Sequence, residues 1–272
     1  FQVGAGQPYY DHVKTLGSAL FVASTLKAFV ESERTDVATF FMLSDYVNMG
    51  WIGKRDGTFI PKAPLYAFRL FSRHFGRTVV KSQTTSATYD SPSVGYVPAV
   101  QGVPYLESVA SLSPDGKKLY LIVINKHASD AIEARVNVAG FAPTSRAQIQ
   151  TLTGTGLDAN TGTQLFEGAG IQWGKQTPVP PANRIDRGGP GEISFGSKTF
   201  TAAGSSFSYV FPKHSVTSIE LSGKTTSGGG TAASAATGLS FGSDAAPGPT
   251  GSAGSITASS PAAQAAAEAF AA

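Results

Sequence analysis

The chain has 272 residues, of which 41% are hydrophobic and only 14% are charged, and it contains no cysteine. The missing cysteines exclude a disulfide scaffold, a thiolate zinc site and a cysteine nucleophile. The net charge of +3 is spread along the chain without a long run of Lys or Arg, which argues against nucleic acid as a partner. No apolar stretch approaches the roughly 18 residues of a membrane span. Because the first residue is Phe rather than Met, we expect the chain to be processed or part of a longer one.

The first region, residues 1–76, is predicted to begin with a helix and a strand. Apolar residues recur at three- and four-residue spacing from Leu16 to Val30, which places an apolar stripe along a helix. The charged segment Glu31 to Arg34 ends that pattern. Residues 36–43 then run apolar without polar alternation, which is typical of a strand buried on both faces in a parallel sheet.

A loop over 50–57 is expected to lead into a second helix. Pro64 begins this helix, and Gly76 is its expected stop. A helix, a doubly buried strand and another helix cannot cover both faces of that strand. The unit therefore implies a partner sheet that this sequence does not contain.

The second region, residues 77–222, is predicted to be all β, in a sandwich or jelly roll. Its strands are short and are separated by turns rich in Gly and Pro. A long excursion over 154–190 is expected to be a surface loop with Trp173 as its apolar anchor. Strands are expected at Leu119–Asn125, Ile132–Val138, Ala147–Leu152, Gly191–Phe195, Phe207–Phe211 and Val216–Leu221.

The third region, residues 223–272, consists mostly of Ala, Gly, Ser and Thr. Such a segment has too little bulky apolar surface to offset the entropy of ordering it. We expect a disordered tail or linker. The predicted fold class is therefore α/β plus all-β: a helix, strand and helix, then a sandwich, then the tail.

Several stretches resemble one enzyme family in order and spacing. They are SALFVASTLKAFVE from Ser18, VATFFMLSDYVNMG from Val37, APLYAFRLFSRHFGRTVV from Ala63, LYLIVINKHASDAIEARVNVAGF from Leu119, TLTGTGLDANTG from Thr151 and FSYVFPKHSVTSIEL from Phe207. The chain resembles the carboxyl-terminal portion of the family 51 α-L-arabinofuranosidases, retaining glycoside hydrolases of clan A. The resemblance implies that residues 1–76 are the last part of a (β/α)8 barrel and that 77–222 is an accessory sandwich.

The resemblance also implies catalysis by two glutamates at the ends of the fourth and seventh barrel strands. Neither glutamate has a counterpart here, so we assign no catalytic residue to this chain and expect it to be inactive alone. The expected partners are a carbohydrate containing arabinose and the amino-terminal barrel portion or a companion chain. We expect no cofactor, and a location outside the cell or in the cell envelope.

Active sites of α/β barrels lie at the carboxyl ends of the strands, which points to the segment after Leu43. Trp51 is the leading candidate for sugar contact, as an apolar platform where the family has a glutamine; the alternative is packing at the barrel rim. Asp45 could hold a hydroxyl or fix its own turn. The remaining candidates are Tyr46, Asn48 and, before the first helix, Tyr10.

The residues give little support for a metal site, a serine nucleophile or a dinucleotide-binding loop. The four histidines, at 12, 74, 127 and 214, show no pair at metal-ligand spacing, so no metal site is expected. Ser, His and Asp never occur in a nucleophile-elbow context, and Gly4-Ala5-Gly6 lacks the features of a dinucleotide loop.

Two alternatives stay open at this level. The first is a non-catalytic carbohydrate-binding or structural subunit, which coplanar aromatic side chains on the sandwich would favour. The second is a xylosidase or glucosidase of the related families 39 or 30, because their sandwiches end similarly. The large aromatic candidates on the sandwich are Tyr89, Tyr96, Tyr105, Tyr120 and Trp173.

Overall fold

The computed structural model describes residues 15–40, 43, 51–55, 58–94, 97–159, 170–172, 175–177, 192–201, 205–226 and 239–242. The helices are α1 (Leu16–Glu31) and α2 (Ala63–Arg73). The strands are β1 (Ile52–Arg55), β2 (Thr58–Pro61), β3 (Thr78–Val80), β4 (Ser82–Thr84), β5 (Thr88–Ser91), β6 (Val100–Pro104), β7 (Leu106–Leu112), β8 (Lys118–Asn125), β9 (Ile132–Val138), β10 (Phe141–Gly154), β11 (Gly170–Gln172), β12 (Lys175–Thr177), β13 (Ile193–Thr201), β14 (Ser206–Phe211), β15 (Ser215–Thr225) and β16 (Leu239–Gly242).

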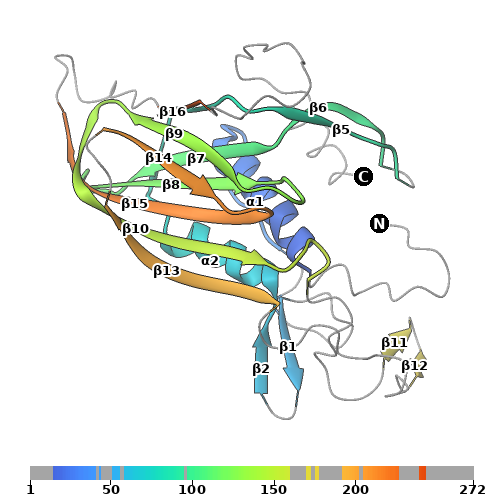
Figure 1. Cartoon of the computed structure of the whole chain (residues 1–272). Helices are drawn as coiled ribbons and strands as arrows, with labels where there is room; N and C mark the ends of the chain where they lie inside the picture. Colours follow the sequence, from blue (N-terminus) through green and yellow to red (C-terminus); the bar gives the residue numbers. More distant parts are fainter. Residues whose placement is uncertain are drawn as a thin grey trace.

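Two sheets form the predicted sandwich (Figure 1). The larger sheet has six strands in the order β13-β10-β15-β8-β7-β3, and every neighbouring pair in it is antiparallel. The smaller sheet has the order β14-β9-β16-β4. The predicted strand over Ile132–Val138 is confirmed as β9, in which Ala134, Val136 and Val138 are buried while Glu133 and Arg135 are exposed.

One hydrophobic core lies within the sandwich. The larger sheet contributes side chains such as Leu121, Val123 and Ile149, and the smaller sheet contributes Val136 and Phe211. Because these side chains repeat every second position, each strand places one set of residues in this core and presents the other set to the opposite side of its sheet.

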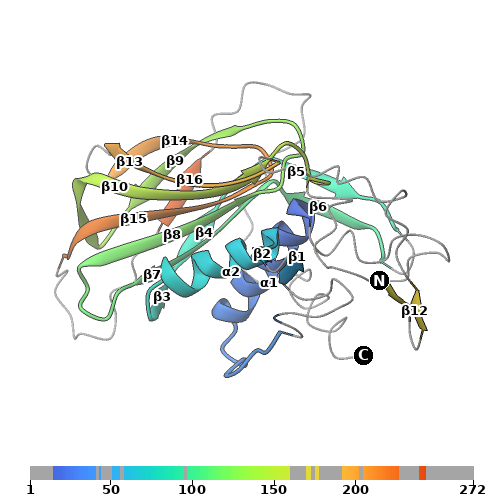
Figure 2. The ribbon, with the colours of Figure 1, turned by 90° about the horizontal axis from the view of Figure 1, so that it is seen from below.

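A second core lies on the other face of the six-stranded sheet, where α1 and α2 cover it (Figure 2). Its sheet residues are Val109 on β7, Ile122 and Ile124 on β8, Leu152 on β10 and Val216 on β15. Strand β8 is thus buried on both faces, which explains why its sequence LYLIVIN shows no polar alternation. The described residues of these elements form three layers: a helix pair, the larger sheet and the smaller sheet.

Local sequence accounts for the two helices. The Thr15 hydroxyl caps α1 by accepting a hydrogen bond of 3.2 Å from the Ser18 backbone N–H. The predicted Pro64 stands in the first turn of α2, where its missing N–H leaves no hydrogen bond unmade. Small buried residues, Ala19 and Ala23 on α1 and Ala63 and Ala67 on α2, belong to the core in which the two helices pack together.

Two expectations for the first region need correction. Residues 36–40 are exposed and outside any strand, although a doubly buried strand was expected over 36–43. A parallel strand needs hydrogen-bonded neighbours, and the described part of the chain offers none to this segment. The expected loop over 50–57 is in part a hairpin, since β1 pairs with β2 between Ile52 and Pro61.

The boundaries of the third region also differ from the expectation. Strand β15 continues to Thr225, and β16 pairs with β9 and, in parallel, with β4. A part of residues 223–272 therefore belongs to the sandwich instead of the expected tail. Trp173, the expected anchor of the long loop, lies outside the described residues, but β11 and β12 pair within that segment.

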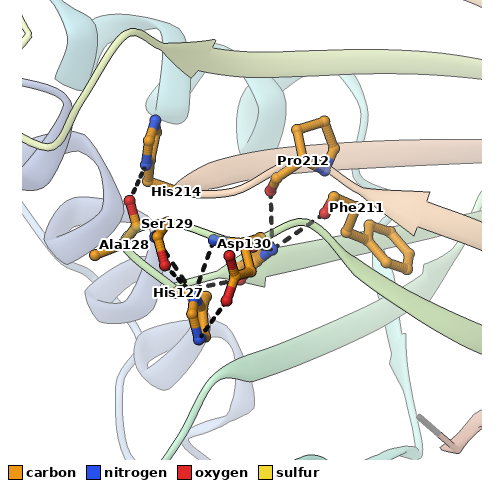
Figure 3. A network of polar contacts seen from close by, with 8 residues as sticks. His127, Ala128, Ser129, Asp130, Phe211, Pro212 and His214 are labelled. Carbon is orange, nitrogen blue, oxygen red and sulfur yellow. Dashed lines mark hydrogen bonds and ion pairs between the residues drawn. The ribbon is translucent and has the colours of Figure 1, made fainter. Parts of the chain in front are cut away.

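A network of hydrogen bonds connects the turns at one end of the sandwich (Figure 3). The buried Asn125 side chain donates from Nδ2 to the carbonyl oxygens of Asp130, Phe211 and Pro212 at 3.3, 3.1 and 2.9 Å. Its Oδ1 accepts from the His127 backbone N–H at 2.9 Å. One amide therefore links the turn after β8 to the turn after β14.

His214 lies in the same network and is fully buried in the turn between β14 and β15. Its Nδ1 is 3.0 Å from the Ala128 carbonyl oxygen, and its Nε2 is 2.8 Å from that of Gly154. The residue has φ of 34°, in the left-handed region that costs a residue with a Cβ. Its two ring contacts hold the residue in that conformation.

We predict that Asn125→Ala lowers the free energy of unfolding by about 2–4 kcal/mol, because several buried backbone groups lose their partner at once. Urea unfolding of the full chain measures the change. Gln148→Ala is the control, since the exposed Gln148 side chain bonds Thr199 across the sheet, and it should stay within about 0.5 kcal/mol. Equal effects of the two substitutions would contradict the assignment.

Candidate functional site

An apolar groove of about 280 Å³ lies between the helix pair and the described residues that follow α1. Several of the large apolar side chains there are exposed: Phe21 by 47%, Leu43 by 60% and Phe68 by 40%. The lining residues are Phe21, Val22, Thr25, Leu26, Phe29, Ala38, Thr39, Phe40, Leu43, Trp51, Leu65 and Phe68.

Trp51, the leading candidate for sugar contact, lies in this groove and is only 5% exposed. Its ring stacks on Phe40 with centroids 3.9 Å apart and contacts Phe68 at 5.1 Å. Its backbone carbonyl accepts from the Lys62 N–H at 2.9 Å, which ties it to the start of α2. In this arrangement Trp51 packs with other apolar rings, and its contact with a sugar stays a prediction.

The other predicted site residues, Asp45, Tyr46, Asn48 and Tyr10, lie outside the described residues. Of the five predicted site residues, the structure describes Trp51. What it does place beside Trp51 is apolar, and this lining supplies few partners for the hydroxyl groups of a sugar. It suits the apolar surface of a protein segment better.

Lys62, which was not among the predicted residues, is fully buried at the amino-terminal end of α2. Lysine is seldom buried without a partner, so burial could not be expected from the residue type. The neighbouring Ala63 and Pro64 are buried too. The start of α2 is thus buried.

Sequence reasoning also left the role of Glu107 on β7 open. Its Oε2 accepts from the Ser24 hydroxyl on α1 at 2.9 Å, and its Oε1 accepts from Lys126 Nζ at 2.7 Å. Burial by itself raises the pKa of Glu107, but Lys126, Lys27 and Ser24 together hold that pKa below its ordinary value of 4.5. This partly buried carboxylate joins the helix layer to the sandwich.

The remaining acids and histidines lie in structural positions. Glu31 and Glu33 are exposed at the carboxyl end of α1, and Glu31 pairs with Lys27 at 2.7 Å. His74 caps α2 through its backbone, and burial lowers the pKa of its ring. Within the described residues, no three His, Asp or Glu side chains gather as a metal site would need.

In the described part of the chain, no helix is long and apolar enough to cross a membrane.

Comparison with known proteins identifies the family. Residues 5–165 match the model of the α-L-arabinofuranosidase C-terminal domain. The chain belongs to this family. The matched residues include both helices and the strands up to β10, so the helix pair and the first part of the sandwich fall within one family unit. No curated protein matches the chain.

Solved structures share the fold of this arabinofuranosidase C-terminal domain. An α-L-arabinofuranosidase from Thermotoga maritima, solved as an arabinose complex, is 22% identical with a TM-score of 0.56, and the match covers 76% of this chain and 38% of that one. A thermostable family 51 enzyme from Thermotoga petrophila is 21% identical with a TM-score of 0.57, and that match covers 81% and 40%. The chain thus spans about two fifths of the length of these structures.

We predict that Glu107→Gln lowers the free energy of unfolding at pH 7 by about 1–3 kcal/mol, because Lys126 loses its partner. Since the folded pKa of Glu107 lies below the unfolded one, its contribution is complete above about pH 4.5 and is lost as the pH falls through the folded value. The deficit of the variant should therefore shrink at about pH 3. Urea unfolding at both pH values measures it.

Glu220→Gln is the matched control, because its partner Lys118 is 46% exposed. Exposed ion pairs contribute about 0–1 kcal/mol, so the control should change stability little. A deficit of Glu107→Gln that is the same at both pH values would show that the carboxylate charge does not stabilise this contact.

Proposed function

We propose that this chain is the carboxyl-terminal part of a retaining glycoside hydrolase that removes terminal arabinofuranosyl residues from polysaccharides. Its membership of the α-L-arabinofuranosidase C-terminal family supports the assignment. Because the chain spans about two fifths of the structures that it resembles, the other parts of the reaction centre lie in polypeptide beyond it. Such a substrate places the enzyme outside the cell or in the cell envelope.

The apolar groove on the helix pair supports a second part of the proposal, namely that another portion of the enzyme covers this groove. A helix that packs on one sheet needs a single apolar stripe, but α1 is apolar on two sides. Leu16, Ala19 and Ala23 are buried in the core on the sheet, while Phe21 and Phe29 line the groove. In the proposal, the remaining strands and helices of a (β/α)8 barrel cover the groove, with α1 and α2 as its last two helices.

The same proposal accounts for residues 36–40. Val37 is 81% exposed, which is unusual for a valine in an uninterrupted apolar run. Once barrel strands are present on both sides, this segment gains backbone partners and becomes the buried strand that its sequence favours. Phe40 and Leu43, at 44% and 60% exposure, lose their contact with water in that step.

In the proposed reaction, this chain and the portion of the enzyme beyond it contribute different groups. Retention needs two carboxyl groups about 5–5.5 Å apart, one as nucleophile and one as general acid and then base. In this proposal both come from the portion beyond this chain. This chain closes the barrel wall and supplies substrate contacts after residue 43, with Trp51 and Asp45 as the leading candidates, beside Tyr46 and Asn48. Tyr10 would line the same end of the barrel.

We predict that the chain alone does not hydrolyse an aryl α-L-arabinofuranoside, and that coexpression with the polypeptide encoded directly upstream of Phe1 gives turnover. Phe21→Asp and Phe68→Asp should lower the recovered activity on the order of tenfold or more, because they place a charge in the contact. Val210→Asp is the control, since Val210 is a comparably exposed apolar residue, at 53%, on β14 of the sandwich.

Turnover by the chain alone would contradict the proposal that both carboxylates lie elsewhere. Equal losses in Phe68→Asp and Val210→Asp would contradict docking through the groove and leave the family assignment standing.

A further inference from the structure

Three aromatic rings form a row at the edge of the sandwich, which we name the aromatic row: Tyr89, Tyr105 and His127. Tyr89 and Tyr105 stack with centroids 4.8 Å apart and planes inclined by 29°. Tyr105 contacts His127 at 4.3 Å. The three rings come from β5, from the residue between β6 and β7, and from the turn after β8.

The row is separate from the two hydrophobic cores. Neither tyrosine belongs to the core between the sheets or to the core under the helices, and each of the three side chains is half-buried. Tyr89 lies on the hairpin β5–β6, which extends beyond the six-stranded sheet (Figure 1). Tyr105 contacts both other rings, so Tyr89 and His127 form the ends of the row.

Backbone contacts hold the rings in place. The Tyr105 N–H donates to the Ala87 carbonyl at 3.0 Å, and the Tyr105 carbonyl accepts from the Lys126 N–H at 2.8 Å. The His127 ring accepts at Nδ1 from the Asp130 N–H at 2.9 Å. A ring that is already fixed in the free protein loses little side-chain entropy when a ligand stacks on it.

Polar groups surround the row and define its charge. Lys126 is neutralised by Glu107 at 2.7 Å. Asp130 is an exposed carboxylate whose Oδ2 lies 3.5 Å from His127 Nε2, and the exposed Asp90 follows Tyr89 in the chain. The Asp90 carboxylate accepts a hydrogen bond of 2.9 Å from the Gly102 N–H and so stabilises the hairpin β5–β6. Burial and the nearby Glu107 raise the pKa of the Tyr89 hydroxyl, which therefore keeps its proton as a donor. These carboxylates disfavour an acidic ligand.

We propose that the aromatic row is a binding platform for a neutral polysaccharide, with the outer face of the Tyr89 ring stacking on the apolar face of a sugar. The Tyr89 hydroxyl and the exposed carboxylates of Asp90 and Asp130 supply partners for sugar hydroxyls. This site lies on the sandwich and needs only residues of this chain. It therefore functions whether or not the groove on the helix pair is covered.

Isothermal titration calorimetry of the full chain with soluble arabinoxylan, at 0.15 M salt, tests whether the aromatic row binds a neutral polysaccharide. We expect saturable binding that Tyr89→Ala weakens by about fivefold to tenfold, the range that a lost stacking contact gives. Tyr89→Leu keeps an apolar side chain on the hairpin but removes the ring, and should weaken binding equally. Tyr89→Phe should retain most of the affinity.

Tyr120→Ala is the matched control, because Tyr120 is a half-buried tyrosine on β8, opposite Glu220, and it should bind as the unchanged chain does. Thermal unfolding checks that each variant is folded. The assignment is overturned if the unchanged chain binds no arabinoxylan, if it binds only the acidic polygalacturonate, or if the folded Tyr89→Leu chain binds as tightly as the original.

Discussion

Strand β8 is buried on both faces, and the arrangement of the other layers depends on it. Leu119, Leu121 and Val123 point into the sandwich, while Ile122 and Ile124 point to the helices. Removing either cover would expose a row of large apolar side chains at about 25 cal/mol for each Å². The helix pair is therefore an integral layer of the fold, and the Glu107 contact with Ser24 adds a polar link between the same two layers.

The helix pair has a second apolar side, and the proposed function follows from it. A free helix layer on a sandwich would present polar residues to water, as surface helices do. Here Phe21, Trp51 and Phe68 line an apolar groove instead. In the proposed function, a barrel portion beyond this chain covers the groove. The sandwich, in contrast, has a complete core of its own.

Much of the fold could be predicted because helix and strand periods are local. The stripe from Leu16 to Val30 and the alternation over Ile132–Val138 gave the correct elements. Residues 36–43 and the LYLIVIN stretch of β8 have the same uninterrupted apolar pattern, but only β8 has neighbouring strands in this chain. Strand β7 escaped prediction because the buried Ser108 and Ser111 interrupt its apolar pattern.

The site was harder to predict because it depends on contacts between distant residues. Nothing local indicates that Trp51 stacks on Phe40, or that Lys62 is fully buried. The pairing of Tyr89 with Tyr105 likewise requires the hairpin β5–β6 to fold back, a geometry set by backbone pairing. Glu107 could be assigned to the sandwich from sequence, but its contact with α1 follows from packing alone.

Hydrogen–deuterium exchange tests the central claim most directly. The full chain is compared alone and after addition of the polypeptide encoded upstream of Phe1. The account predicts that amides of α1, α2 and residues 36–40 become protected at least several-fold, while those of β8 and β15 change little because both strands are already covered. Unchanged exchange in both helices, or protection confined to the sandwich, would contradict it.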